Sequence, residues 1–167
     1  MFAAGADVVQ LDEPFLQAQP EKAREFGIAA INKALEGAAG ETAVHLCFGY
    51  GARVSTKPSA YSFLPELERT SADQISIETA QPNLDCSMLE RLPTKRIVLG
   101  VVDLGTETIE TPETVAQRIK KALPYISADR LLIAPDCGMK YLSREAALGK
   151  LTSMVEGAAL VRQELTG

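Results

Sequence analysis

His45 and Cys47 are separated by one residue in a stretch rich in apolar side chains. If that stretch is a β-strand, its two-residue period points both side chains to the same side, where one metal ion can bind both. Cys137 lies in the turn APDCG, in which Pro135 and Gly138 indicate an exposed turn rather than a packed core position. Imidazole and thiolate are both zinc ligands in proteins, so these residues are candidate metal donors.

Glu78 supplies a fourth candidate donor, because it ends the apolar run QISIE and an unpaired carboxylate is costly to bury there. A histidine and a cysteine two positions apart are a weak signal alone, since a buried free cysteine is usually just a small apolar residue. The glutamate and Cys137 at equivalent strand ends strengthen the prediction of a zinc site. Two thiolates, one carboxylate and a neutral imidazole leave a charge near minus one, which keeps bound thiolates nucleophilic. Cys86, in DCSMLERL, has no other candidate metal ligands at equivalent positions, and it is assigned to packing or to the surface.

The elements that must position these donors recur in a regular order. A short run rich in Val, Ile or Leu is followed by a polar loop and then by a stretch with helical periodicity. The strand candidates are apolar enough to be covered on both faces, as parallel strands are. They span residues 7–11, 43–48, 74–77, 96–102 and 131–134.

A helix is expected after every strand. The first spans residues 20–36, with Pro20 in its first turn and Gly37 at its end, and its expected buried face consists of Ala23, Phe26, Ala30 and Ala34. Shorter helices are expected near residues 64–69 and 85–92. Thr111 is expected to cap a helix that starts at Pro112 and runs through Leu123, and Ser143 to cap a last helix that ends near Glu164.

Strict alternation of five strands and helices predicts an α/β protein with a parallel sheet, either doubly wound or a closed barrel. Polar residues at or just past the carboxyl ends of all five strands favour the barrel, which collects its active site there. Besides the four metal donors, these residues are Asp12, Glu13, Asp103 and Asp136. A complete (β/α)₈ TIM barrel has eight units and typically about 250 residues. Residues 1–167 are therefore expected to form the C-terminal portion of one barrel domain, about five βα units, with three N-terminal units missing.

Composition limits the possible partners. The 46% hydrophobic content indicates a chain with a sizeable core, and the net charge of -5, with scattered Lys and Arg residues, argues against nucleic acid. No apolar run approaches the roughly 20 residues that span a bilayer, and the N-terminus lacks the features of a secretion signal, so the cytoplasm is the expected compartment. An incomplete barrel with exposed strand edges is expected to need the missing half or a partner chain.

The strings VVQLDEP, HLCFG, ISIE, LGVVD and APDCGMKY, in this order, resemble the catalytic C-terminal domain of cobalamin-independent methionine synthase. By that resemblance, His45, Cys47, Glu78 and Cys137 match the family's zinc ligands, and Asp12 matches the aspartate that holds the substrate's amino group. Glu13, next to it, is expected to bind substrate as well. The implied reaction is methyl transfer to the sulfur of homocysteine. Zinc would generate the thiolate, because a free thiol with a pKa near 8.5 is mostly protonated at neutral pH.

This sequence departs from the family on the side of the methyl donor. The family's proton-donating histidine falls at Gly105, and its folate-contacting glutamate falls at Ala18. Asp103 is the candidate catalytic residue in place of that histidine, with Glu107 as a second possibility, although either carboxyl needs a raised pKa to hold a proton at pH 7. The departures suggest that the thiol-binding half is retained while the donor differs from a folate, for example a methylated corrinoid.

Three other interpretations remain open from the sequence. The first is a zinc-dependent enzyme that alkylates a different thiol, such as coenzyme M, although Asp12 offers a carboxylate for an amino group. The second is a noncatalytic metal-binding fragment. The third is an oxidoreductase with a dinucleotide fold, but no GxGxxG follows any of the expected strands.

Overall fold

The protein contains one five-stranded sheet in which every neighbouring pair of strands is parallel. The structure, a computed structural model, describes residues 1–48 and 60–167. The strands are β1 (Val8–Glu13), β2 (Glu41–Leu46), β3 (Gln74–Glu78), β4 (Arg96–Val102) and β5 (Leu131–Pro135), and their order in the sheet is their order in the sequence. A doubly wound sheet reverses its strand order at a switch point, whereas a barrel does not. The topology therefore has the sequential order of a barrel, as predicted.

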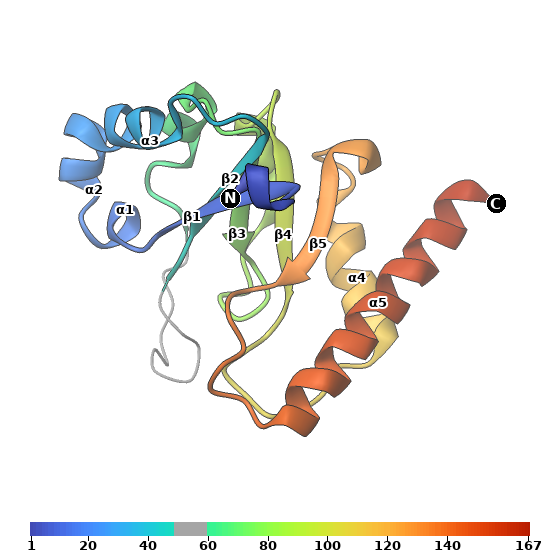
Figure 1. The fold of residues 1–167 in the computed structure, drawn as a ribbon. Helices are drawn as coiled ribbons and strands as arrows, with labels where there is room; N and C mark the ends of the chain where they lie inside the picture. The colour runs from blue at the N-terminus through green and yellow to red at the C-terminus, as the bar shows by residue number, and fades with distance from the viewer. Residues whose placement is uncertain (49–59) are drawn as a thin grey trace.

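The helices lie in two groups beside the sheet (Figure 1). Near β1 and β2 are α1 (Phe15–Ala18), α2 (Pro20–Lys22), the π-helical turn η2 (Ala23–Gly27) and α3 (Ile28–Leu35). Near β4 and β5, the long helix α5 (Arg144–Thr166) packs along α4 (Pro112–Ala122). Short 3₁₀ helices complete the set: η1 (Phe2–Ala4), η3 (Leu64–Arg69), η4 (Cys86–Arg91) and η5 (Ala128–Arg130). The segments near 64–69 and 85–92 are thus helical as expected, but in the tighter 3₁₀ form.

The two predicted helix caps are confirmed. The Thr111 side chain accepts a hydrogen bond from the backbone N–H of Thr114, and Pro112 occupies the first helical position of α4. The Ser143 side chain accepts from the backbone N–H of Ala146 at the start of α5. Both caps satisfy N–H groups that have no partner within their helix.

The predicted buried face of the first helix is wrong except at Ala23. The buried positions are Ala23, Gly27, Ile31 and Leu35, whereas Phe26 is 54% exposed and both Ala30 and Ala34 are exposed. A π-helical turn spans Ala23–Gly27, and its wider winding places Gly27 rather than Phe26 over Leu16. A Cβ atom on Gly27 would lie 2.7 Å from Leu16 Cδ2, so this close packing requires glycine.

The edge strands are more exposed than the sequence suggested. Residues of β2 and β3 are almost all buried, but β1 alternates between exposed and half-buried residues, and β5 is half-buried throughout. Apolar grooves run beside both edges, lined among others by Leu11, Phe26 and Ala30 next to β1, and by Leu131, Ile133 and Leu165 next to β5. That the missing barrel half or a partner chain covers these edges stays a prediction.

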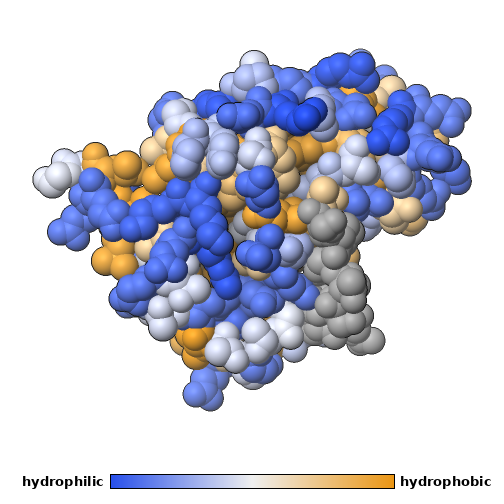
Figure 2. Space-filling view, turned by 180° about the vertical axis from the view of Figure 1, so that it is seen from behind, coloured by the Kyte–Doolittle hydropathy of each residue, from blue (hydrophilic) through white to orange (hydrophobic). Residues whose placement is uncertain are grey.

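Apolar residues also remain exposed on α5, including Leu148 (63%) and Val155 (64%). Viewed from behind, apolar clusters interrupt the polar surface on the side where α5 lies (Figure 2).

Among the described residues, no helix combines the length and apolar character needed to cross a membrane.

A buried ionic network fastens the loop after β4 to α4 and α5. The Lys150 side chain is fully buried, and its Nζ donates to Glu110 Oε2 at 2.9 Å and to the carbonyl oxygen of Asp103 at 2.9 Å. Arg118 Nη1 donates to Glu110 Oε1 at 3.0 Å and to the carbonyl oxygen of Val101 at 2.8 Å. Burial alone would raise the pKa of Glu110, but hydrogen bonds from Lys150, the Asp103 N–H and Arg118 outweigh it and lower that pKa.

Glu110→Gln is expected to lower the free energy of unfolding by about 2 to 3 kcal/mol at neutral pH, because it leaves the buried Lys150 ammonium without its counter-ion. A carboxylate with a lowered pKa stabilises the fold above its unfolded value and loses this effect as the pH falls through its folded value. The difference between wild type and Glu110→Gln should therefore shrink below about pH 4.5. Urea denaturation at several pH values measures it, and a difference that grows on acidification would contradict the assignment.

Candidate metal centre

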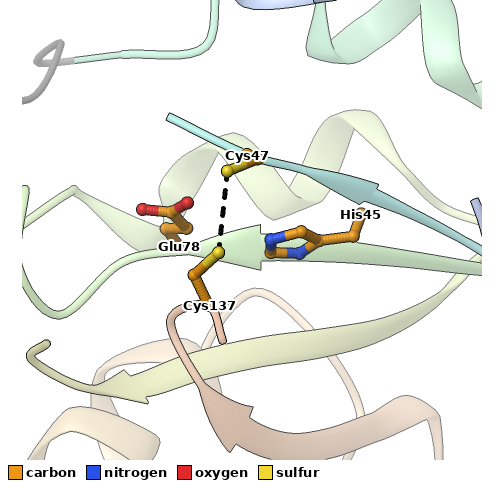
Figure 3. Close-up of side chains that lie close together, drawn as sticks. All are labelled: His45, Cys47, Glu78 and Cys137. Atoms are coloured by element: carbon orange, nitrogen blue, oxygen red, sulfur yellow. Dashed lines mark hydrogen bonds between the residues drawn. The ribbon is translucent and has the colours of Figure 1, made fainter. Parts of the chain in front are cut away.

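The four predicted metal donors come together at the carboxyl ends of three strands (Figure 3). His45 lies on β2, Cys47 follows that strand by one residue, Glu78 is the last residue of β3, and Cys137 follows β5. Their candidate ligand atoms all lie within 4.8 Å of one another. Because parallel strands end at the same edge of a sheet, residues distant in sequence become neighbours there. The predicted constellation is therefore present in the structure.

The histidine is held so that one ring nitrogen is available to an ion. His45 is 5% exposed, and its Nδ1 lies 2.8 Å from Ser76 Oγ on β3, its register partner. Among the residues that the structure describes, no hydrogen-bond partner lies near the buried Nε2. A metal-bound histidine typically donates its other ring N–H to a nearby oxygen, which fixes the tautomer. The Ser76 contact places His45 in that arrangement, with Nε2 directed to the cluster.

The two cysteine sulfur atoms are 3.6 Å apart. A tetrahedral ion with bonds of about 2.0 to 2.3 Å separates its donors by roughly 3.3 to 3.8 Å, so this spacing suits a shared ion. The contact with Cys47 raises the pKa of the Cys137 thiol well above its usual range, and burial and the negative charge of Cys47 act in the same direction. A divalent cation bound here would remove this conflict, because it would replace the proton and stabilise both thiolates.

Glu78 is fully buried, and backbone groups orient it. Its Oε1 accepts a hydrogen bond from the N–H of Phe48 at 2.9 Å, which ties the end of β3 to the segment after β2. The Tyr61 hydroxyl accepts from the N–H of Glu78 at 2.8 Å and donates to the Leu46 carbonyl oxygen at 3.2 Å. Burial raises the pKa of Tyr61, so its hydroxyl stays protonated, and its ring stacks on Phe48 at a centroid distance of 4.3 Å.

The other candidate residues lie around this centre in different ways. Asp12 is paired in register with His45, so both side chains are on the same face of the sheet. Glu13 points to the opposite face, where its Oε1 accepts from the N–H of Phe15 at 2.8 Å, and it is not brought together with the donors. Both residues lie inside β1 rather than beyond its end. Asp103 follows β4, and its Oδ1 accepts from the N–H of Gly105 at 2.7 Å.

Two sequence predictions outside the donor set are also resolved. Cys86 is 5% exposed and belongs to the hydrophobic core, which is the first of the two roles, packing or surface, that the sequence left open for it. Glu107 accepts hydrogen bonds from the Oγ and N–H of Ser143, which lower its pKa. The raised pKa required of a proton donor is therefore not met by Glu107.

Ser76, Tyr61 and Asp136 support the centre but were not assigned to it from the sequence. Ser76 has a sequence signal, because it precedes Glu78 by two residues and faces His45 across the strand pair. Asp136 was identified only as a polar residue at a strand end, and nothing in its neighbourhood indicates its partners. Tyr61 lies between two elements and has no periodic context that would indicate its role.

Comparison with known proteins identifies the family. Residues 1–160 match the family model described as the catalytic domain of cobalamin-independent synthase. The chain belongs to this family. It is therefore similar to methionine synthase enzymes, and its α/β sheet corresponds to part of their barrel.

Individual relatives agree with this result. The chain is 39% identical over 165 residues to a methionine synthase of Saccharolobus islandicus strain Y.G.57.14, with 97% of this chain and 46% of the relative covered. For the methionine synthase of Sulfurisphaera tokodaii, the identity is 34%, with 97% and 45% covered. The chain thus spans about half the length of these relatives.

This chain also covers about half the length of similar proteins whose structures are solved. A B12-independent methionine synthase from Shewanella sp. W3-18-1, in complex with selenomethionine, superposes with a TM-score of 0.93 at 37% identity, covering 99% of this chain and 51% of that one. A putative vitamin-B12-independent methionine synthase from Listeria monocytogenes, at 18% identity and a TM-score of 0.67, shares the fold and covers 95% and 50%.

Cys47→Ser and Cys137→Ser are each expected to abolish tight binding of a divalent metal ion, because a serine hydroxyl is a far weaker donor than a thiolate. Metal analysis after dialysis should find about one ion per wild-type chain and little in either variant. Cys86→Ser is the matched control, since that thiol lies in the core, and it should retain the ion. Full metal content in the Cys137→Ser variant would show that Cys137 is not a ligand.

Proposed function

We propose that this chain supplies the zinc site of an enzyme that transfers a methyl group to the sulfur of homocysteine, giving methionine. The observation that carries the proposal is the convergence of two cysteines, one histidine and one glutamate within 4.8 Å at the carboxyl edge of the sheet. Two soft sulfur donors with one imidazole suit zinc better than magnesium or calcium, which prefer oxygen ligands.

The acceptor side of the reaction has the strongest support. Zinc held by these four residues would supply the positive charge that keeps the acceptor sulfur deprotonated at neutral pH. The similar Shewanella enzyme was solved with selenomethionine, a molecule that resembles the product proposed here. Ser76, Tyr61 and the Phe48 N–H orient the donors before an ion arrives, which limits the reorganisation that binding requires.

Asp12 is proposed to bind the amino group of homocysteine. Its side chain is exposed on the face of the sheet that carries His45, one strand away. Its Oδ1 accepts a hydrogen bond from Gln10 Nε2 at 3.0 Å, which leaves further lone pairs for a substrate ammonium. Glu13 lies on the opposite face and is not retained in this role.

The methyl donor is proposed to be a folate, as the family suggests, with a methylated corrinoid as a second candidate. Methyl transfer from a folate nitrogen leaves an amine that benefits from protonation. On the loop after β4, Gly105 offers no side chain, the pKa of Glu107 is lowered, and the Asp103 carboxylate bonds to the Gly105 N–H. Such a loop suits a donor whose leaving group needs no proton, and this observation is the reason for the corrinoid as the second candidate.

Turnover distinguishes the two donors. The zinc-loaded full-length enzyme that contains this chain is mixed with homocysteine and either methyltetrahydrofolate or methylcobalamin, and methionine is measured by mass spectrometry. We expect methionine with at least one donor, lost in Cys47→Ser. Efficient turnover with the folate alone would exclude the corrinoid, and the reverse result would support it. Zinc binding without methionine from either donor would indicate a noncatalytic metal-binding fragment.

Asp12→Asn is expected to weaken homocysteine binding by about 10-fold to 100-fold, because a charge-assisted hydrogen bond to the ammonium is lost. Binding of the same thiol without its amino group should hardly change. Glu13→Gln, the neighbouring carboxylate on the opposite face, serves as the control and should bind both thiols normally. Calorimetric titration measures both affinities, and a wild-type preference for the amine-free thiol would overturn the role of Asp12 and favour the coenzyme M-like alternative.

A further inference from the structure

Asp136 lies between Pro135, the last residue of β5, and the metal donor Cys137. It is 1% exposed, and its carboxylate accepts hydrogen bonds from three consecutive backbone N–H groups of the loop that follows the donor Glu78. Oδ1 accepts from Thr79 at 3.1 Å and Ala80 at 3.0 Å, and Oδ2 accepts from Gln81 at 2.7 Å. One side chain therefore connects the residues next to two of the four donors.

This connection crosses a strand. In the sheet, β4 lies between β3 and β5, so Asp136 must pass over β4 to reach the loop after β3. It passes at Gly100, where an added Cβ atom would overlap Asp136 Oδ1 and would lie 2.7 Å from its Cα atom. Both connected segments are also hydrogen-bonded to the backbone of β4. Thr79 Oγ1 donates to the Gly100 carbonyl oxygen at 2.6 Å, and the Asp136 N–H donates to the Val102 carbonyl oxygen at 3.2 Å.

We propose that Asp136 is a positioning residue for the metal centre: through the space left by Gly100, it fixes the separation between the Glu78 carboxylate and the Cys137 thiol. The proposal rests on the proposed metal-binding function. A carboxylate can accept all three N–H bonds because it has two acceptor oxygens and no proton of its own. No neutral side chain of the same size can do so.

A second contact in the sheet allows the positioning role of Asp136 to be distinguished from a general contribution to the stability of the fold. At the opposite end of β3, the more exposed Asp73 links this strand to β2, where its Oδ2 accepts from the N–H of Thr42 at 2.8 Å and from Thr42 Oγ1 at 3.0 Å. Asp73 directly precedes β3, whereas the metal donor Glu78 ends it. Asp73→Asn therefore makes the same chemical change as Asp136→Asn at a site remote from the donors.

The two variants should behave differently towards zinc. Asp136→Asn turns an amide NH₂ group towards backbone N–H donors, which releases the loop after Glu78 and lets Glu78 and Cys137 move apart. We expect zinc affinity, measured by competition with a chromophoric chelator, to fall by about 10-fold to 100-fold, as for other residues that support metal ligands. Asp73→Asn should lower the melting temperature while leaving zinc affinity unchanged.

Gly100→Ala provides a second test, because its methyl group would overlap Asp136, and would lie 2.9 Å from the Ile77 carbonyl oxygen, without removing any polar group. It should reproduce the weaker zinc binding and change the absorption bands of the cobalt(II)-substituted protein in the same direction as Asp136→Asn. Hydrogen exchange of the amides of residues 79–81, followed in the metal-free protein, should be faster in both variants than in wild type and Asp73→Asn. This second measurement needs no metal.

The outcomes separate the two proposals. A wild-type chain that binds no zinc overturns the proposed function, and slow exchange of residues 79–81 in Asp136→Asn then overturns the positioning role as well. A wild-type chain that binds zinc, with Asp136→Asn and Gly100→Ala binding it equally tightly, retains the function and rejects the positioning role. Should Asp136→Asn fail to fold, Gly100→Ala decides the question by the same comparison.

Discussion

The proposed metal centre depends on one requirement, that four groups from three separate strand ends approach closely enough to share an ion. Charged and polar groups are costly to bury unless partners compensate them, and Glu78 and His45 are both buried. The sheet meets the requirement by ending β2, β3 and β5 at one edge, and neighbouring groups hold His45 and Glu78 there. Ser76 holds the imidazole, Phe48 and Tyr61 hold the glutamate, and Asp136 adjoins Cys137.

The same requirement explains which parts of the structure could be predicted from the sequence. The candidate metal donors and the caps at Thr111 and Ser143 follow from local rules, because strand periodicity and N-cap chemistry act over a few residues. The barrel order follows from the polar residues at the ends of all five strands. The buried face of the first helix depended on a π-helical turn at Ala23–Gly27, which arises from packing on Leu16. Asp136 was unpredictable for a related reason: its partners lie more than fifty residues away and are backbone groups, which leave no trace in side-chain patterns.

The two sides of the proposed reaction differ in how completely these residues build them. For binding of the acceptor thiol, the sheet carries the four candidate metal ligands, the groups that support them, and Asp12. For the methyl donor, Gly105 stands where the family has a proton-donating histidine. Lys150, Glu110 and Arg118 fix the loop around Gly105. This loop has a defined shape, but it lacks the histidine that could protonate a leaving amine. The identity of the methyl donor is therefore the main question on this side of the reaction. The curated relatives are about twice as long as this chain, so the full reaction is proposed for the whole enzyme.

X-ray absorption at the zinc edge tests the central claim most directly, because it counts the atoms bound to the ion. For the zinc-loaded chain without substrate, the account predicts two sulfur atoms at about 2.3 Å and two nitrogen or oxygen atoms at about 2.0 to 2.2 Å. A first shell made only of nitrogen and oxygen, or one that contains a single sulfur, would contradict it, because Cys47 and Cys137 would then not share the ion.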